Sequence, residues 1–206
     1  MIPKFITLEG GEGSGKTTQA KNLTSWLALS GFSVLRTREP GGSAGAEAIR
    51  GLILGRSGWD PVAEMALHFA ARREHWAKTI QPSLAAGSFV VCDRFFDSTL
   101  AYQVAGQGAP RQVWADLRAA TLGQVAPDLT LLLDLPVKLG LERANRRGEI
   151  NRYDLLGQAF HQRVRDCFLA QAAAEPGRFV LINAAAPLAE VTAALIAACR
   201  DRLGLP

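Results

Sequence analysis

The sequence is poor in the residues that build disulfide frameworks and metal centres. Its three cysteines, at positions 92, 167 and 199, form neither a Cys-x-x-Cys pair nor an even-numbered framework. Its three histidines also lack the spacing of metal ligands. Scattered thiols of this kind suit a reducing compartment, so we expect a cytoplasmic protein.

The sequence also lacks an apolar run long enough to span a membrane, although 48% of its residues are apolar. Its first residues lead straight into an apolar strand pattern, so we expect no signal peptide. It contains no repeat, no low-complexity tract and no interdomain linker. We therefore expect one α/β domain of 206 residues and no membrane partner.

The charge of the chain points to phosphorylated ligands. Its net charge is +4, and arginine supplies 18 of its 23 basic residues. The arginines form no single block, and aromatic residues do not interleave with them as they do in single-strand binding proteins. Arginine also binds phosphate with two parallel hydrogen bonds. Small phosphorylated ligands therefore explain the charge as well as a nucleic-acid polymer would, and we expect no polymer partner.

The most informative segment runs from Gly10 to Thr17 and reads Gly-Gly-Glu-Gly-Ser-Gly-Lys-Thr. It fits the phosphate-binding loop (P-loop), in which backbone N–H groups and the next helix N-terminus surround phosphates. We expect Lys16 to reach the terminal phosphates and the Thr17 hydroxyl to coordinate Mg²⁺. The nucleotide-binding residues predicted from this segment are Gly10, Gly11, Gly13, Ser14, Gly15, Lys16, Thr17 and Thr18.

Apolar runs that alternate with amphipathic segments predict the rest of the fold. Strands are expected at residues 4–8, 33–37, 89–93, 128–134 and 178–182. Helices are expected at residues 18–30, near 46–54, and at 60–85, 137–143, 154–174 and 187–203. Asp60-Pro61 has the sequence of a helix N-cap followed by proline at the first helical position. Strands that alternate with helices around a P-loop predict a doubly wound, five-stranded parallel sheet.

Two of the predicted strands end in an aspartate, Asp93 and Asp134. The carboxyl ends of parallel strands face the ligand crevice. Both residues therefore resemble the carboxylate that lies near Mg²⁺ in P-loop enzymes, and the sequence leaves both open. We favour Asp93, because Arg94 follows it and puts an acid and a base together.

Residues 143–152 carry four arginines around Gly148. Charge runs of this kind are usually solvated basic loops. This run, however, follows a strand and a helix on the loop side, where a lid over nucleotide phosphates would lie. We interpret residues from about 143 to 153 as a mobile, arginine-rich lid.

The residues by themselves indicate an enzyme that handles a nucleoside triphosphate and has a second, arginine-lined anion site. The alternative of a different class is a regulatory nucleotide switch, but the chain lacks the Asn-Lys-x-Asp element that reads guanine in GTPases. Transport and helicase ATPases are usually longer. Among kinases, any nucleoside or nucleotide monophosphate kinase fits at this point.

Further motifs carry a resemblance to a known family. They are Thr37–Gly42 (Thr-Arg-Glu-Pro-Gly-Gly), Phe69–Arg73, Asp93–Gln103, Leu131–Pro136 and Arg147–Glu149. Together with the P-loop, and over nearly the whole chain, they closely resemble bacterial thymidylate kinase. The resemblance implies a single P-loop kinase domain over residues 1–206 that uses ATP and Mg²⁺ to convert dTMP to dTDP for dTTP synthesis. It also implies a homodimer.

The resemblance further implies roles for residues at matching positions. Glu12 is expected to accept a hydrogen bond from the 3′-OH of the acceptor deoxyribose. Phe69 is expected to stack on thymine, and Arg73 to donate to its O4. Arg94, helped by Arg38, is expected to hold the 5′-phosphate of the acceptor.

The same resemblance places Asp93 near Mg²⁺ and the acceptor phosphate. The residues that it assigns to the sugar and base pocket are Ser98, Thr99, Tyr102 and Gln103. Among them, Tyr102 is expected to exclude a ribose 2′-OH.

The catalytic arginine is expected to come from the lid. Some thymidylate kinases carry a basic residue inside the P-loop, directly after the acidic one, where this chain has Gly13. Charge still develops on the transferring phosphoryl group, so another cation must meet it. Arg147, next to Gly148, is our first candidate and Arg146 the second. Arg143 is expected on the ATP side.

Three positions depart from the family pattern. Arg72 stands where Asp or Ala is frequent, and His75-Trp76 replaces Gln followed by His or an apolar residue. Asp154 stands where Glu is usual. These departures affect the expected contacts around the base and the lid rather than the reaction.

Overall fold

The computed structural model describes residues 2–146, 152–153 and 155–206. In this part of the chain five strands form one parallel sheet in the order β2-β3-β1-β4-β5. They are β1 (Phe5–Glu9), β2 (Val34–Arg38), β3 (Phe89–Asp93), β4 (Leu129–Asp134) and β5 (Phe179–Asn183). Each predicted strand lies within one residue of its expected bounds. The predicted five-stranded parallel sheet is confirmed.

The central strands form from apolar runs because both of their faces are covered. Every residue of β1 is buried, as are all residues of β4 except Asp134. Leu8 of β1 pairs with Asp93 of β3 on one side and with Leu131 of β4 on the other. This register brings the ends of β1 and β3 level, so the loops that follow them open at one edge of the sheet.

Helices connect the strands in the alternation that the sequence predicts. In chain order they are α1 (Lys16–Leu29), α2 (Ala44–Gly55), α3 (Pro61–His75), the π-helical turn η1 (Trp76–Ile80), α4 (Gln81–Ala85), α5 (Phe96–Thr99), the π-helical segment η2 (Leu100–Gly106), α6 (Arg111–Leu122), α7 (Val137–Arg146), α8 (Gln158–Ala174) and α9 (Leu188–Leu203). None of those described is both long enough and apolar enough to cross a membrane.

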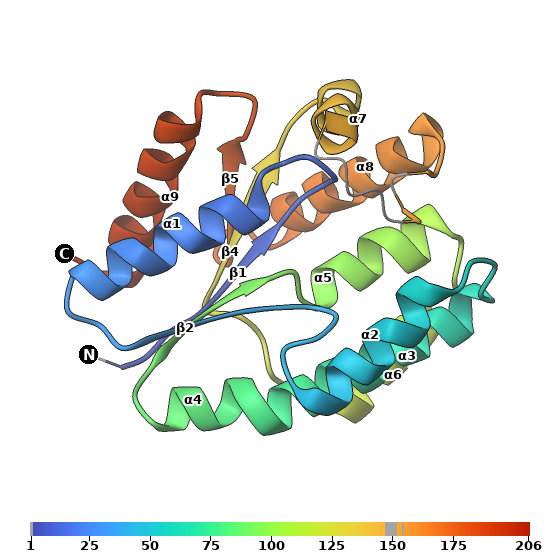
Figure 1. Ribbon diagram of the computed structural model, residues 1–206, viewed down its shortest axis with the longest axis horizontal. Helices are drawn as coiled ribbons and strands as arrows, with labels where there is room; N and C mark the ends of the chain where they lie inside the picture. The colour runs from blue at the N-terminus through green and yellow to red at the C-terminus, as the bar shows by residue number, and fades with distance from the viewer. Residues whose placement is uncertain (1, 147–151, 154) are drawn as a thin grey trace.

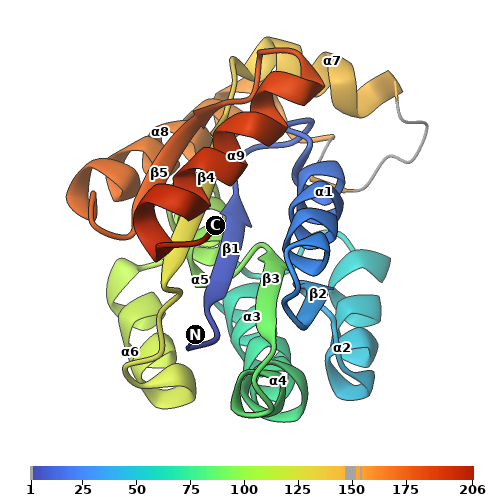
Figure 2. The same ribbon diagram turned by 90° about the vertical axis from the view of Figure 1, so that its left-hand side faces the viewer.

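The helices form a layer on each side of the sheet. Helices α1 and α9 lie on one side, where Leu23 and Leu195 pack with Ile6 and Leu131 (Figure 1). Helices α3, α6 and α8 lie on the other side, where their apolar residues form two further clusters. Figure 2 shows β1 between β3 and β4, with all three strands running in the same direction. The arrangement is the predicted doubly wound one.

The long helix predicted from residue 60 to residue 85 is present, but it is not uniform. Asp60 caps it, because its side chain accepts hydrogen bonds from the backbone N–H groups of Val62 and Ala63. The α-helical part ends at His75, and the π-helical turn η1 joins it to α4. Such turns widen a helix locally and are frequent near functional sites.

Three parts of the helical prediction differ from the structure, and in one of them α7 continues to Arg146 instead of ending at residue 143. The sequence reading assigned no helix between Arg94 and Gly123, where α5, η2 and α6 lie. The predicted site residues of this segment alternate with apolar residues, several of which pack under the sheet and stabilise these helices. Helix α8 begins at Gln158, after a turn at residues 155–156, rather than at residue 154, which lies outside the described residues.

The P-loop packs against the backbone of α7. A Cβ atom at Gly140 of α7 would lie 2.5 Å from the carbonyl oxygen of Glu12, and one at Gly13 would lie 2.0 Å from the carbonyl oxygen of Gly140. Both distances are far below van der Waals contact. The two glycines therefore allow the loop and the helix to touch.

Because a Cβ added at Gly140 would meet the P-loop and one added at Gly51 would meet no described atom nearby, replacing each with alanine should change the free energy of unfolding in opposite directions. Gly140→Ala should lower the free energy of unfolding by about 1–3 kcal/mol and weaken ATP binding, because the new methyl group displaces the P-loop. Gly51→Ala in α2 is the matched control, since an added Cβ meets no described atom within 4 Å. It should stabilise the protein by about 0.5–1 kcal/mol. Chemical denaturation of both variants tests this, and equal effects would contradict the packing argument.

Candidate active site

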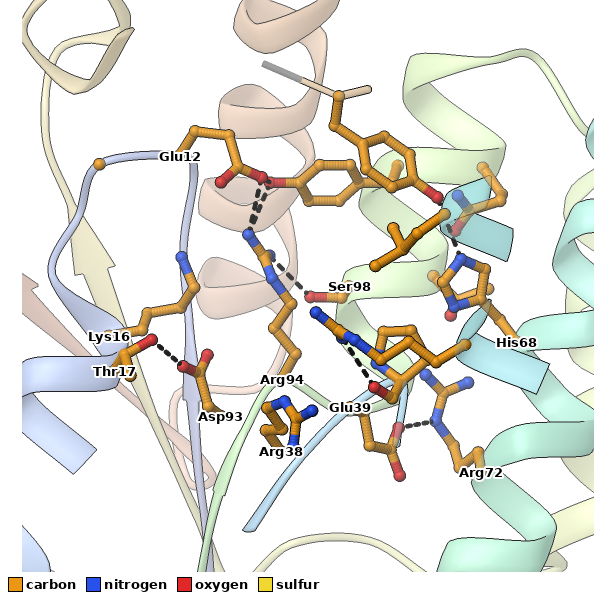
Figure 3. A pocket seen from close by; sticks show the side chains of 18 of the residues that line it. Glu12, Lys16, Thr17, Arg38, Glu39, His68, Arg72, Asp93, Arg94 and Ser98 are labelled. Carbon is orange, nitrogen blue, oxygen red and sulfur yellow. Dashed lines mark hydrogen bonds and ion pairs between the residues drawn. The ribbon is translucent and has the colours of Figure 1, made fainter. Parts of the chain in front are cut away.

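A cavity of about 610 Å³ opens at the carboxyl ends of β1 and β3. This volume suits a small ligand. The P-loop residues Lys16 and Thr17 lie at one end, and His68 and Arg72 of α3 lie at the other (Figure 3). Arg94 lies between the two ends. The cavity thus has cationic side chains along its whole length.

The P-loop end is built around Lys16, the first residue of α1. Its Nζ donates to the carbonyl oxygens of Gly10 and Gly11, at 3.1 and 2.8 Å, and to the Ser14 hydroxyl at 3.1 Å. Burial, together with the charge of Arg94, lowers the pKa of Lys16 to about 8. The acceptors of the ammonium group are therefore neutral and weak. A phosphate oxygen bound at the same place would accept a stronger hydrogen bond.

The two strand-end aspartates have different neighbours. The Thr17 hydroxyl donates to Oδ2 of Asp93 at 2.7 Å. Asp134 instead forms a two-point ion pair with Arg165, at 2.7 and 2.9 Å. Asp93 also lines the cavity, whereas Asp134 does not. The geometry supports the preference for Asp93.

Arg94 is the centre of the hydrogen-bond network in the middle of the cavity. It adopts a left-handed backbone conformation with φ of 72°. Its guanidinium donates to Glu12 at 3.0 Å and to the carbonyl oxygen of Gly10 at 3.1 Å. The Tyr102 hydroxyl donates to the same carboxylate oxygen at 2.8 Å. Burial opposes ionisation of Glu12, but the charges of Arg94 and Lys16 outweigh it and lower the pKa of Glu12 to about 2.

Glu9 holds the turn that carries Arg94, a role that the sequence reading missed. Its fully buried carboxylate accepts from the backbone N–H of Phe95 at 2.7 Å and from the Ser98 hydroxyl at 2.6 Å. Burial, with the charge of Asp97, raises the pKa of Glu9 to about 7. Glu9 is thus a structural acid beneath the site.

At the α3 end of the cavity, the lining residues differ by one position from the residues that the sequence predicts. Phe69 is fully buried in an apolar cluster, and Arg73 is exposed and donates to the carbonyl oxygen of Thr121. Neither lines the cavity; His68 and Arg72 do. Side chains of adjacent helical residues point in directions about 100° apart. The pair Phe69 and Arg73 therefore lies on a different face of α3 from the pair His68 and Arg72, one residue earlier. The predicted contacts of Phe69 and Arg73 with the thymine base are therefore wrong, because neither side chain reaches the cavity.

His68 and Arg72 face the cavity in different states. His68 is neutral, because burial and the charge of Arg72 lower its pKa to about 3. Its Nε2 lies 3.2 Å from the Tyr153 hydroxyl. Arg72 is only 2% exposed, and its Nη1 is buried without a hydrogen-bond partner among the described residues. A buried N–H without a partner is costly unless a ligand accepts from it.

Most of the other predicted residues line the cavity, and three residues of the P-loop do not. Those that line the cavity are Glu12, Gly13, Gly15, Lys16, Thr17, Thr18, Arg38, Asp93, Arg94, Ser98, Thr99, Tyr102, Gln103 and Arg143. Gly10 and Gly11 border a small separate cavity of about 20 Å³, and Ser14 is buried and accepts a hydrogen bond from Lys16. The cavity also has lining residues that the sequence reading did not assign, namely Glu39, Pro40, Arg50, Leu54, His68, Arg72 and Tyr153.

The predicted lid lies only partly within the described chain. Arg143 reaches the cavity and donates to the carbonyl oxygen of Ala184 at 2.8 Å. Arg146 ends α7 with an exposed side chain. Arg147, the first candidate for the catalytic cation, lies outside the described residues. Arg152, which is within the described residues again, forms an ion pair with buried Glu64.

The fold and the cavity together define a class of protein. A P-loop on the central strand of a parallel sheet, facing a second cationic site across one cavity, is the arrangement of a P-loop nucleoside monophosphate kinase. A family profile described as thymidylate kinase matches residues 8–195. The chain therefore belongs to the thymidylate kinase family, whose reaction is the phosphorylation of dTMP with ATP.

Individual relatives agree with this assignment. The chain is 50% identical over 203 residues to a thymidylate kinase of Caulobacter vibrioides, with 98% of each chain covered. It is 47% identical over 204 residues to one of Chromohalobacter salexigens, with 97% and 96% covered. The crystal structure of thymidylate kinase from Ehrlichia chaffeensis superposes with a TM-score of 0.79 at 34% identity and covers 95% of this chain and 97% of its own.

The low pKa of Lys16 predicts proton uptake on ATP binding. At pH 8.5 a group with a pKa of about 8 is roughly three-quarters neutral, and phosphate oxygens beside it restore its proton. Calorimetric titration with MgATP, in buffers of different ionisation enthalpy, should report an uptake of about 0.7 proton per site. Lys21→Ala, which removes an exposed lysine of α1, should leave the uptake unchanged. A binding enthalpy independent of the buffer would contradict the prediction.

Proposed function

We propose that this chain transfers the γ-phosphoryl group of ATP to the 5′-phosphate of dTMP, which gives ADP and dTDP. The observation that carries the proposal is a single cavity with the Lys16 ammonium at one end and Arg72 at the other, where Nη1 of Arg72 has no hydrogen-bond partner among the described residues. One end suits the phosphates of the donor, and the other suits a carbonyl group of a pyrimidine base. Arg94 lies between them, where the two phosphate groups would meet.

The proposed mechanism is electrostatic. Negative charge spreads over the transferring phosphoryl group in the transition state, and Lys16 and Arg94 offer positive charge on its two sides. The acceptor phosphate is largely ionised at neutral pH, so no general base is needed to activate it. Asp93 therefore acts through its charge rather than by removing a proton.

The donor set at the P-loop end fits Mg²⁺. The Thr17 hydroxyl oxygen and the Asp93 carboxylate lie within 2.7 Å of each other, and such oxygen atoms are the ligands that Mg²⁺ prefers. Mg²⁺ supplies neutralisation of phosphate charge when it is bound. The two residues would hold it, directly or through water.

The acceptor end fits thymidine monophosphate in its base and its sugar. Arg72 can donate from Nη1 to a base carbonyl, and the neutral ring of His68 lies on the same face of α3. Glu12, held by Arg94 and Tyr102, offers a carboxylate to the 3′-OH. Tyr102 lies edge-on to Tyr153, with ring centroids 5.6 Å apart, in a position that would narrow the space beside the sugar.

The remaining parts of the proposal rest on the family resemblance. We assign the cation that meets the transferring phosphoryl group to Arg147 first and Arg146 second, with Arg143 on the ATP side. We also propose that the protein acts as a homodimer in the cytoplasm.

Lys16→Ala should reduce kcat about 10³-fold, or about 4 kcal/mol, because no other described side chain can replace its charge at the donor phosphates. A coupled assay of ADP release with dTMP measures the loss. Lys21→Ala on the exposed side of α1 is the control and should keep full activity. Near-normal turnover of a folded Lys16→Ala enzyme would overturn the P-loop assignment.

A matched pair of arginine variants tests whether Arg72, and not Arg73, contacts the base. Arg72→Lys keeps a charge beside Glu39 but loses the guanidinium fork, so kcat/KM for dTMP should fall about 10- to 100-fold. The preference for dTMP over dCMP should fall by a similar factor, because dCMP offers an amino group where dTMP has a carbonyl. Arg73→Lys should change neither value. The opposite result would restore the original assignment of Arg73.

A further inference from the structure

We propose that His75 is a positioning residue that, through Glu39, aims Arg72 at the base of the acceptor. The inference rests on the proposed function, in which Arg72 donates to a base carbonyl of dTMP. His75 is fully buried and does not itself line the cavity.

The first link is the carboxylate of Glu39, which follows strand β2. Its backbone N–H donates to the carbonyl oxygen of Asp93 at 2.9 Å, which ties this residue to the end of β3. Its two carboxylate oxygens have different partners. Oε2 accepts from Nε of Arg72 at 2.6 Å, and Oε1 accepts from Nδ1 of His75 at 3.0 Å. An ionised carboxylate only accepts hydrogen bonds, so Nδ1 of His75 carries a proton.

The second link fixes the imidazole ring of His75. Its Nε2 lies 2.7 Å from the Thr37 hydroxyl, which donates to it when the ring is neutral with its proton on Nδ1. Gly42 covers this contact: a Cβ there would lie 2.3 Å from Nε2 and 2.5 Å from Oγ1 of Thr37. The Pro-Gly-Gly turn therefore encloses the ring, and hydrogen bonds at both nitrogens set its orientation.

The third link is the guanidinium group of Arg72. Nε is held by Glu39, and Nη2 donates to the carbonyl oxygen of Phe95 at 3.1 Å. The rings of Phe69 and Phe95 pack 5.0 and 5.5 Å from its central carbon. Because the group is planar, two fixed nitrogens determine where the third points. Nη1 is buried and has no hydrogen-bond partner among the described residues, so it is the nitrogen that we assign to the ligand.

These links make the direction of Nη1 depend on His75. Without the donor on Nδ1, one oxygen of the Glu39 carboxylate is left unpaired in a buried place. The carboxylate can then turn to seek another donor, and Arg72 turns with it. The consequence is a loss of base recognition, with little effect on the P-loop end of the cavity.

Two polar substitutions separate the links. His75→Asn places an amide nitrogen near the position of Nδ1 and keeps a donor for Glu39. His75→Gln places its amide near the position of Nε2, beside Thr37, and leaves Glu39 without that donor. We expect His75→Gln to raise the KM for dTMP about tenfold, with kcat changed less than about threefold. We expect His75→Asn to stay within about threefold of the wild-type KM.

The specific readout is the ratio of kcat/KM for dTMP to that for dCMP. It should fall about tenfold in His75→Gln and recover in His75→Asn, while the KM for ATP stays unchanged in both. In an Arg72→Lys background, His75→Gln should cause no further fall, because the two residues act in one chain of contacts. Thr79→Val is the structural control, since it removes only the 2.9 Å hydrogen bond from Thr79 to the carbonyl oxygen of Gly42 in the same turn.

The outcomes distinguish this inference from the proposed function. A wild-type enzyme that does not prefer dTMP to dCMP would overturn the proposed function and the inference together. A preference that Arg72→Lys removes but His75→Gln preserves would overturn the inference alone. The inference is also wrong if Thr79→Val lowers the ratio as much as His75→Gln, or if His75→Gln has its full effect in the Arg72→Lys background.

Discussion

The burial of positive charge in the cavity is the constraint on which the rest of the site depends. A buried cation is costly unless it is hydrogen-bonded or paired. Lys16 meets this requirement with backbone carbonyl groups, and Arg94 and Arg72 meet it with the carboxylates of Glu12 and Glu39. The cations therefore have fixed positions before any phosphate arrives. Anionic ligands then find them already oriented, which is the basis of electrostatic catalysis.

The sheet order brings these groups together from distant parts of the sequence. Strand β1 lies between β3 and β4, so the P-loop opens beside the turn that follows Asp93. Glu9, the last residue of β1, accepts hydrogen bonds from Phe95 and Ser98 in that turn. This buried carboxylate helps to hold Arg94 in its left-handed conformation, which a residue with a side chain adopts only at a cost. The position of Arg94 therefore depends on contacts between the ends of β1 and β3 and not on one sequence motif alone.

The sequence predicted those features that depend on neighbouring residues along the chain. The P-loop, the strand ends and the Asp60 cap are local patterns, and the structure contains each of them. The assignment of Phe69 and Arg73 failed because a motif match does not say which side of a helix faces a cavity. A signal was present: Glu64, His68 and Arg72 are spaced by four residues and lie on one side of α3. The buried partners Glu9 and Glu39 could not be predicted, because their contacts depend on the packing of separate strands.

The close contact between Gly13 and Gly140 connects two features that the sequence treated separately. The P-loop has no side chain at residue 13, and α7 comes so near that a Cβ there would lie 2.0 Å from a helix carbonyl oxygen. A basic residue at this position would push α7, with Arg143 and Arg146, away from the loop. The same glycine that leaves the P-loop without a guanidinium group therefore lets a helix that carries arginines pack beside it. Within the described residues, this packing brings Arg143 of α7 to the wall of the cavity that the P-loop also lines.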